Sequence, residues 1–115
     1  TTEIYTLSLH DALPIYFAHL PIIKRLTRMP VCIDPSHSVG TREASPDGVL
    51  DVLHSTSQGI IAGANMVLVD FHPSPTDALV DGPQALTLDE LPKFIEDTRI
   101  SREAYKQRVE LWAEK

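Results

Sequence analysis

The segment MPVCIDPSH at residues 29–37 is a short apolar run that ends in carboxylate, hydroxyl and imidazole side chains. Its first part, residues 29–34, is rich in β-branched residues and predicts a buried strand of a parallel sheet. A second apolar run, NMVLVDF at residues 65–71, also ends at an acid and an imidazole, Asp70 and His72. The two runs predict parallel strands joined by a right-handed crossover, which is typical of an α/β protein.

Helical periodicity surrounds both runs. Residues 17–28 and 46–64 place apolar side chains three and four positions apart, and residues 86–112 are typical of a third, mostly charged helix. Ser45 is expected to cap the second helix, and a T-x-x-E capping box beginning at Thr87 is expected to open the third. Two strands cannot form a stable sheet with both faces covered, so the pattern predicts further strands upstream of this α/β segment.

Composition limits the class of protein. The chain has 115 residues, a net charge of −6 and one cysteine, Cys32. That length allows one domain at most, and the lysines and arginines form no cluster, which argues against nucleic acid or an acidic membrane as a partner. One cysteine excludes an internal disulfide, and no apolar run approaches the roughly 20 residues of a membrane-spanning helix. These properties predict a cytoplasmic protein.

Residues 1–15, TTEIYTLSLHDALPI, are expected to be an artefact rather than part of the protein. Codons can be chosen for all of these residues so that the DNA resembles a common short-read sequencing adapter. The alternative is an ordinary amphipathic N-terminal segment, but a complete in-frame match is hard to obtain by chance. We therefore exclude these residues from the fold argument and expect residues 16–115 to be a C-terminal fragment.

Three residues near the predicted strand ends, His37, Asp70 and Asp81, supply one nitrogen donor and two carboxylates. In α/β proteins, ligands bind at the carboxyl ends of the strands. The three side chains can therefore converge on a divalent ion such as manganese, iron, cobalt or zinc. Each residue also has a structural interpretation, since His37 and Asp70 can cap local turns and Asp81 can form an Asx-turn before Gly82. Composition and spacing leave both interpretations open.

Three motifs carry a family resemblance: PVCIDPSHSVGTRE at residues 30–43, GIIAGANMVLVDFHP at 59–73 and ALVDGPQAL at 78–86. They resemble the metal-dependent family of 3-deoxy-7-phosphoheptulonate synthases, which also contains 3-deoxy-octulosonate 8-phosphate synthase. The resemblance covers residues 16–115 and implies that they form the last two β/α units of a (β/α)8 TIM barrel. It also implies a transferase that condenses phosphoenolpyruvate with erythrose 4-phosphate, the first step of the shikimate pathway to chorismate and the aromatic amino acids. The fragment alone is expected to be inactive, and the parent protein is expected to be a homo-oligomer.

The resemblance implies roles for the three candidate ligands. His37, Asp70 and Asp81 match metal ligands of the family, and a bound divalent ion would act as a Lewis acid toward the aldehyde oxygen of the substrate. The fourth family ligand is a cysteine on an early strand, and Cys32 is not its match because it lies beside the DPSH motif. Many relatives carry glutamate at the position of Asp70, so the carboxylate here is shorter by one methylene.

Other polar side chains of the same motifs are candidates for the substrate site. Asp34 and Asp81 are the predicted catalytic carboxylates, which would orient water or substrate hydroxyls. His72 is either a hydrogen-bonding group behind the metal ligands or the first residue of a turn before Pro73.

Arg42 is the candidate for binding a phosphate group of the aldose, because a guanidinium fork matches phosphate oxygens. The hydroxyls of Ser36 or Ser38 are expected to assist it, since barrel phosphates often bind at the last loops. The alternative for Arg42 is a surface ion pair with Glu43.

Two other functions compete with the leading one. The octulosonate 8-phosphate synthase branch shares the barrel, the metal and phosphoenolpyruvate, and differs in the aldose. A non-catalytic interaction module is the second alternative, in which the final charged helix binds a partner and the acids at the strand ends only cap turns.

Overall fold

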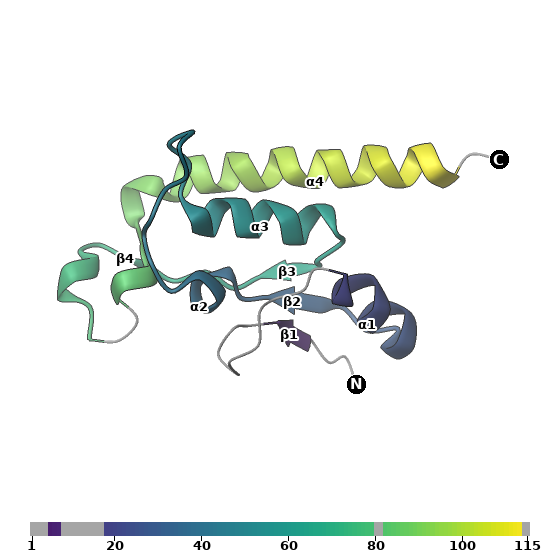
Figure 1. Cartoon of the computed structure of the whole chain (residues 1–115), viewed down its shortest axis with the longest axis horizontal. Helices are drawn as coiled ribbons and strands as arrows, with labels where there is room; N and C mark the ends of the chain where they lie inside the picture. Colours follow the sequence, from purple (N-terminus) through teal and green to yellow (C-terminus); the bar gives the residue numbers. More distant parts are fainter. Residues whose placement is uncertain (1–4, 8–17, 80–81, 114–115) are drawn as a thin grey trace.

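The computed structural model describes residues 5–7, 18–79 and 82–113 of the chain (Figure 1). Helices α3 (Asp51–Ile61) and α4 (Leu91–Ala113) lie one above the other, with α3 between α4 and the strands β2 (Val31–Ile33) and β3 (Met66–Val67). The elements in chain order are β1 (Tyr5–Leu7), α1 (His19–Thr27), β2 (Val31–Ile33), α2 (Pro35–Val39), α3 (Asp51–Ile61), β3 (Met66–Val67), β4 (Phe71–His72), the 3-10 helices η2 (Pro75–Asp77) and η3 (Gly82–Gln84), β5 (Leu86–Thr87), the 3-10 helix η4 (Leu88–Glu90) and α4 (Leu91–Ala113).

The strands β1, β2 and β3 form a three-stranded parallel sheet in that spatial order. Cys32 of β2 is opposite Met66 of β3, and Ile33 is opposite Val67. The predicted α/β class and the parallel pairing of the two apolar runs are therefore confirmed. Strand β1 comes from the segment 1–15 that the sequence argument set aside, and its pairing with β2 does not bear on the origin of that segment.

The hydrophobic core lies on the face of β2 that α1 and α3 cover. Leu20, Val31, Ile33 and Ala64 are each at most 5% exposed and form one cluster. Gly59 of α3 sits so close to the sheet that a Cβ atom there would meet the side chain of Ile33. A glycine at this position therefore lets α3 approach β2 closely.

The other face of β3 is not covered by the described residues. Met66 and Leu68 are 48% and 50% exposed, although both are large apolar side chains. Burying such side chains normally stabilises a protein by about 1.5–3 kcal/mol each. The sheet therefore presents one packed face and, at β3, one face that is still largely open.

The start of α3 differs from the prediction. The helix begins at Asp51 rather than at Pro46, and Ser45 does not cap it. Ser45 instead accepts a backbone hydrogen bond from Gly48, which has a positive φ of 87°, while Ala44 and Leu50 form an antiparallel bridge. Proline, aspartate and glycine in succession form a tight turn because each favours one of its backbone conformations. That turn chemistry overrides the helical period.

The second strand is also shorter than predicted. Only Met66–Val67 pair with β2, and Phe71–His72 form a separate parallel pair with β5. The backbone N–H of Leu68 still donates to Ile33, but Pro35 then begins α2, so β2 offers no further ladder partners. The chain between β3 and β4 must therefore find other partners, and this is where Asp70 lies.

The two outer helices follow the prediction more closely. Helix α1 ends at Thr27, and Arg28 adopts a left-handed conformation with φ of 58°. Thr87 and Glu90 form the predicted capping box ahead of α4. None of the helices in the described parts of the chain is long and apolar enough to cross a membrane.

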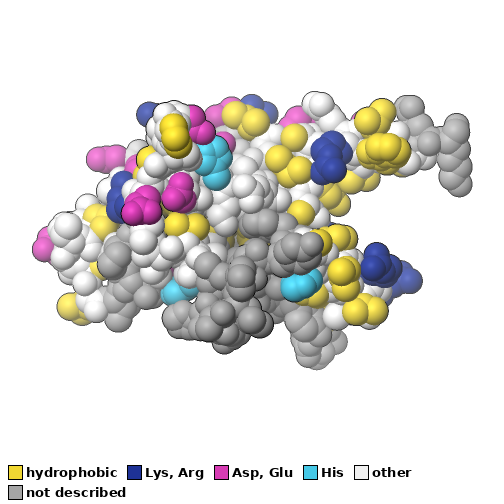
Figure 2. Space-filling view, viewed as in Figure 1, with side chains coloured by type: hydrophobic (Ala, Val, Ile, Leu, Met, Phe, Trp, Pro, Cys, Tyr) yellow, Lys and Arg dark blue, Asp and Glu magenta, His cyan; other side chains and the backbone are white. Residues whose placement is uncertain are grey.

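The last turns of α4 extend past α3 and carry exposed apolar side chains, with Trp112 81% exposed. Figure 2 shows hydrophobic side chains gathered over this end of α4 and over α1 below it. A groove of about 670 Å³ lies between these elements, and its lining includes Pro21, Ile61 and Tyr105.

Candidate functional site

Asp34 and His37 form a paired unit at the point where β2 gives way to α2. Asp34 is the N-cap residue of α2, and its Oδ1 accepts a hydrogen bond from the backbone N–H of His37 at 3.2 Å. Its Oδ2 lies 2.7 Å from Nδ1 of the same histidine. A carboxylate only accepts hydrogen bonds, so Nδ1 carries a proton, and in the neutral ring Nε2 then carries the lone pair. One buried acid therefore sets both the start of the helix and the tautomer of the imidazole.

The serines of the DPSH motif tie this unit to its surroundings. Ser38 Oγ donates to the carbonyl of Asp34 at 2.8 Å, and Ser36 Oγ accepts a hydrogen bond from the backbone N–H of Asp70 at 3.0 Å. Both serines are buried. The Ser36 bond places Asp70 beside α2, even though the two residues are 34 positions apart in the sequence.

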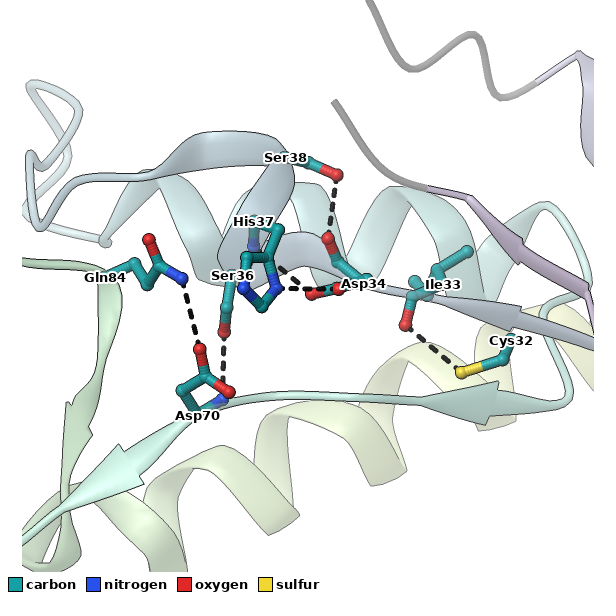
Figure 3. A network of polar contacts seen from close by, with 8 residues as sticks. All are labelled: Cys32, Ile33, Asp34, Ser36, His37, Ser38, Asp70 and Gln84. Atoms are coloured by element: carbon teal, nitrogen blue, oxygen red, sulfur yellow. Dashed lines mark hydrogen bonds and ion pairs between the residues drawn. The ribbon is translucent and has the colours of Figure 1, made fainter. Parts of the chain in front are cut away.

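Gln84 completes the arrangement around Asp70. Its side-chain Nε2 donates to Asp70 Oδ2 at 3.2 Å, and the backbone N–H of Leu86 donates to the Asp70 carbonyl at 2.8 Å. Figure 3 shows the two contacts, with Gln84 bonded to the carboxylate of Asp70 and Ser36 bonded to its backbone nitrogen. Gln84 is part of the DGPQ motif, but nothing in its residue type or spacing predicted a role for it. Its burial and its bond to a candidate ligand identify it as part of the site.

The Ser36 bond places the backbone of Asp70 beside α2, the helix that carries His37, so two of the three predicted metal ligands lie in the same region. Asp81, the third predicted ligand and a predicted catalytic carboxylate, lies outside the described residues. Within the described ranges, no three histidine, cysteine, aspartate or glutamate side chains are grouped as a metal site. Metal ligation by His37, Asp70 and Asp81 thus stays a prediction.

The donor chemistry around His37 nevertheless fits a divalent ion. A histidine that binds a metal through one ring nitrogen usually donates its other N–H to a carboxylate, and Asp34 occupies that position here. An imidazole nitrogen with a carboxylate oxygen suits zinc, iron, cobalt or manganese. Both oxygens of Asp34 contact His37. Its predicted role of orienting water or substrate hydroxyls stays a prediction.

Arg42 has a different partner from the one considered in the sequence argument. It forms a forked ion pair with Glu90, with Nη1–Oε1 and Nη2–Oε2 distances of 3.0 Å, rather than a pair with the neighbouring Glu43. Nη1 also donates to the carbonyl of Ala85 at 3.0 Å. The Arg42 hydrogen bond is the main reason that the pKa of Glu90 is lowered to about 2, and the same bond raises the pKa of Arg42. Phosphate binding by Arg42 stays a prediction.

His72 takes part in a local turn. Its Nδ1 accepts a hydrogen bond from the backbone N–H of Ser74 at 2.9 Å, across Pro73. This is the contact expected of a residue that starts the turn. Its other proposed role, behind the metal ligands, is untested.

Comparison with known proteins agrees with the motifs. Residues 13–107 match the model of the DAHP synthetase I family. The phospho-2-dehydro-3-deoxyheptonate aldolase of Thermotoga maritima is 30% identical over 90 residues, which are 78% of this chain and 25% of that protein. The 2-dehydro-3-deoxyphosphooctonate aldolase of Legionella pneumophila (strain Lens) is 30% identical over 90 residues, 75% of this chain and 33% of the relative. The protein of that name from Geobacter metallireducens is 35% identical over 80 residues, 66% and 29% of the two chains.

A solved structure shows the same relationship in three dimensions. The crystal structure of the Thermotoga maritima phospho-2-dehydro-3-deoxyheptonate aldolase (DAHP synthase) superimposes with a TM-score of 0.67 at 30% identity, covering 78% of this chain and 25% of that one. The chain thus spans about a quarter to a third of the length of these relatives. The family match covers most of the chain, from the first helix into α4, so the chain belongs to the DAHP synthetase I family.

Proposed function

We propose that the chain is the C-terminal part of a 3-deoxy-7-phosphoheptulonate synthase, contributing the last two β/α units of its TIM barrel. The observation that carries the proposal is the Asp34–His37 pair at the start of α2, where Ser36 also binds the backbone N–H of Asp70, in a member of the DAHP synthetase I family. These groups lie beyond the carboxyl ends of adjacent parallel strands, where barrel enzymes hold their substrates. The open face of β3, with Met66 exposed, is what removing one sector of a barrel would leave.

The proposed reaction joins phosphoenolpyruvate to erythrose 4-phosphate. The π electrons of the C2–C3 double bond of phosphoenolpyruvate form a bond from C3 to the aldehyde carbon, and the electron pair of the aldehyde double bond moves to its oxygen, which takes up a proton. Water adds at the electron-deficient C2 and loses a proton. The C2–O bond to phosphate then breaks as the C2 hydroxyl loses its proton and becomes the ketone, which releases inorganic phosphate. The reaction needs groups that stabilise negative charge on the aldehyde oxygen and groups that orient the water.

The residues of this chain would serve that reaction by holding a divalent ion and orienting the groups around it. Nε2 of His37 and the carboxylates of Asp70 and Asp81 would hold the ion. A divalent ion there supplies Lewis acidity toward the aldehyde oxygen. Asp34 fixes the orientation of the His37 ring, and Gln84 fixes that of the Asp70 carboxylate.

An octulosonate 8-phosphate synthase is the second candidate. Its support is that two relatives named 2-dehydro-3-deoxyphosphooctonate aldolase, those of Legionella pneumophila and Geobacter metallireducens, are 30% and 35% identical to this chain. The two candidates differ in carbon count. A seven-carbon product requires a four-carbon aldose phosphate beside the three carbons of phosphoenolpyruvate, and an eight-carbon product requires a five-carbon one.

The test uses the full-length protein encoded by the gene. Phosphoenolpyruvate consumption and phosphate release are measured with a four-carbon and with a five-carbon aldose phosphate. We expect turnover with erythrose 4-phosphate, loss of turnover after exhaustive chelation, and its return with manganese or zinc. Turnover with only the five-carbon aldose establishes the second candidate, and activity that survives chelation refutes metal dependence. No consumption with either aldose and any added metal overturns both in favour of a non-catalytic module.

A further inference from the structure

We propose that Arg42 is a positioning residue that, together with Glu90, holds the segment 82–87 in place so that Gln84 orients the carboxylate of Asp70. This inference rests on the proposed function, since it assigns Asp70 to the reaction. It gives the ion pair a task inside the site, where the sequence argument considered only phosphate binding or a surface contact for Arg42.

The guanidinium of Arg42 binds two residues of the segment that follows η3, Ala85 and Glu90. Two of its N–H groups bind the two oxygens of Glu90, and a third binds the carbonyl of Ala85, all at 3.0 Å. Ala85 is the residue directly after Gln84. The fork therefore fixes the backbone next to the side chain that touches Asp70, a geometry that lysine cannot reproduce.

Glu90 links the hydrogen bonds of Arg42 to the capping box that precedes α4. Its Oε1 accepts a hydrogen bond from the backbone N–H of Thr87 at 2.7 Å and also binds Arg42. One carboxylate thus serves as the capping-box acid and as the partner of the arginine. Movement of Arg42 would disturb both ends of the stretch from Ala85 to Glu90.

The segment reaches Asp70 through two bonds. Gln84 donates to the Asp70 carboxylate, and the backbone N–H of Leu86 donates to the Asp70 carbonyl. Arg42 itself follows α2, the short helix that carries His37. The contacts thus link the two candidate ligands by a second route, separate from the Ser36 bond.

The charge around Arg42 favours this role over phosphate binding. Glu90 neutralises the guanidinium at hydrogen-bonding distance, and its own negative charge would repel a phosphate placed on the same group. If Arg42 positions the segment, loss of either partner should have the same effect. If it binds substrate, only the loss of Arg42 should weaken substrate binding.

The experiment compares the single variants Arg42→Gln, Arg42→Lys and Glu90→Gln with the double variant Arg42→Gln/Glu90→Gln and the charge exchange Arg42→Glu/Glu90→Arg, all in the full-length protein. We expect each single variant to lower kcat by about tenfold, the lower end of what loss of a supporting contact costs, with KM for the aldose phosphate changed less than about twofold. The double variant Arg42→Gln/Glu90→Gln should be no worse than either single one, and the charge exchange should recover part of kcat. Arg99→Gln is the matched control, because it removes a forked pair with Glu96 on the exposed side of α4 and should leave kcat unchanged.

A second readout does not depend on activity. Hydrogen exchange of the Leu86 amide, measured in metal-free protein, should be faster in Arg42→Gln and Glu90→Gln than in the wild type or in Arg99→Gln. Unchanged exchange overturns the proposal. A tenfold rise in KM for the aldose phosphate in Arg42→Gln, with Glu90→Gln silent, also overturns it and establishes phosphate binding. Faster exchange in a protein without synthase activity would show that the pair fixes the segment while the proposed function is wrong.

Discussion

The packed face of β2 and the polar groups beyond its carboxyl end are held in place by different forces. On the face toward α1 and α3, side chains such as Val31 and Ile33 are buried by contacts that have no preferred direction. Beyond the carboxyl end of the strand, Asp34, Ser36 and Asp70 are held by directional hydrogen bonds of 2.7–3.2 Å. A change of volume should therefore matter on the packed face, and a change of donor or acceptor should matter at the polar end. Substitutions on the packed face should therefore alter stability, and substitutions at the polar end should alter activity.

The largest expected effect belongs to the polar end. His37→Ala in the full-length protein should abolish turnover, a loss greater than the roughly 10–100-fold cost of removing a group behind a metal ligand. Cys32→Ser is the control, because this buried side chain belongs to β2, the strand that precedes α2, and has no assigned role in the reaction. Initial rates of phosphoenolpyruvate consumption measure both. Equal and mild losses in the two variants would contradict the ligand assignment.

The packed face should respond in stability. Ile33 is 1% exposed and lies against Gly59, so Ile33→Ala should lower the free energy of unfolding by about 2–5 kcal/mol. Leu26→Ala, at a position of α1 that is 77% exposed, should change it by less than about 0.5 kcal/mol. Denaturant unfolding of the full-length protein measures both changes. A large loss of kcat in folded Ile33→Ala protein would break the distinction between the two regions.

The smallest expected effect is a loss of stability at low pH, caused by protonation of Glu90. Because the pKa of Glu90 falls from 4.5 to about 2 in the folded protein, this carboxylate adds stability that is complete above pH 4.5 and is lost as the pH falls toward 2. Its contribution should be on the order of 1 kcal/mol, since the pair with Arg42 is about one-third exposed and solvent screens it. The check is the difference in unfolding free energy between wild type and Glu90→Gln, measured from pH 6 downward. A difference that does not shrink below pH 4.5 would show that the charge of Glu90 is not involved.

The elements that follow from local sequence were predictable. The β-branched run around Val31 and the apolar period of α3 each depend on residues close in the chain, and so does the Thr87–Glu90 capping box. Even the start of α3 had a local signal, because Pro46 is followed by aspartate and glycine, which favour a turn over the helix assigned there. The division of the second strand had no such signal. It depends on where β2 ends, which is set by Pro35 in another part of the chain.

The candidate site divides in the same way. The DPSH motif identified Asp34, Ser36 and His37, but it could not show that Asp34 orients the imidazole or that Ser36 binds the Asp70 backbone. The partner of Arg42 is 48 residues away, so spacing alone pointed to its neighbour instead. Contacts of this kind are set by how distant segments pack, and no local pattern contains them.

The single thiol of the chain can report on the strand that joins the two regions. Cys32 is in the middle of β2, between the packed face and the polar end, and is 4% exposed. Alkylating reagents can reach such a sulfur only when the surrounding structure opens. The rate at which Cys32 is alkylated would therefore measure how often β2 separates from the elements packed against it.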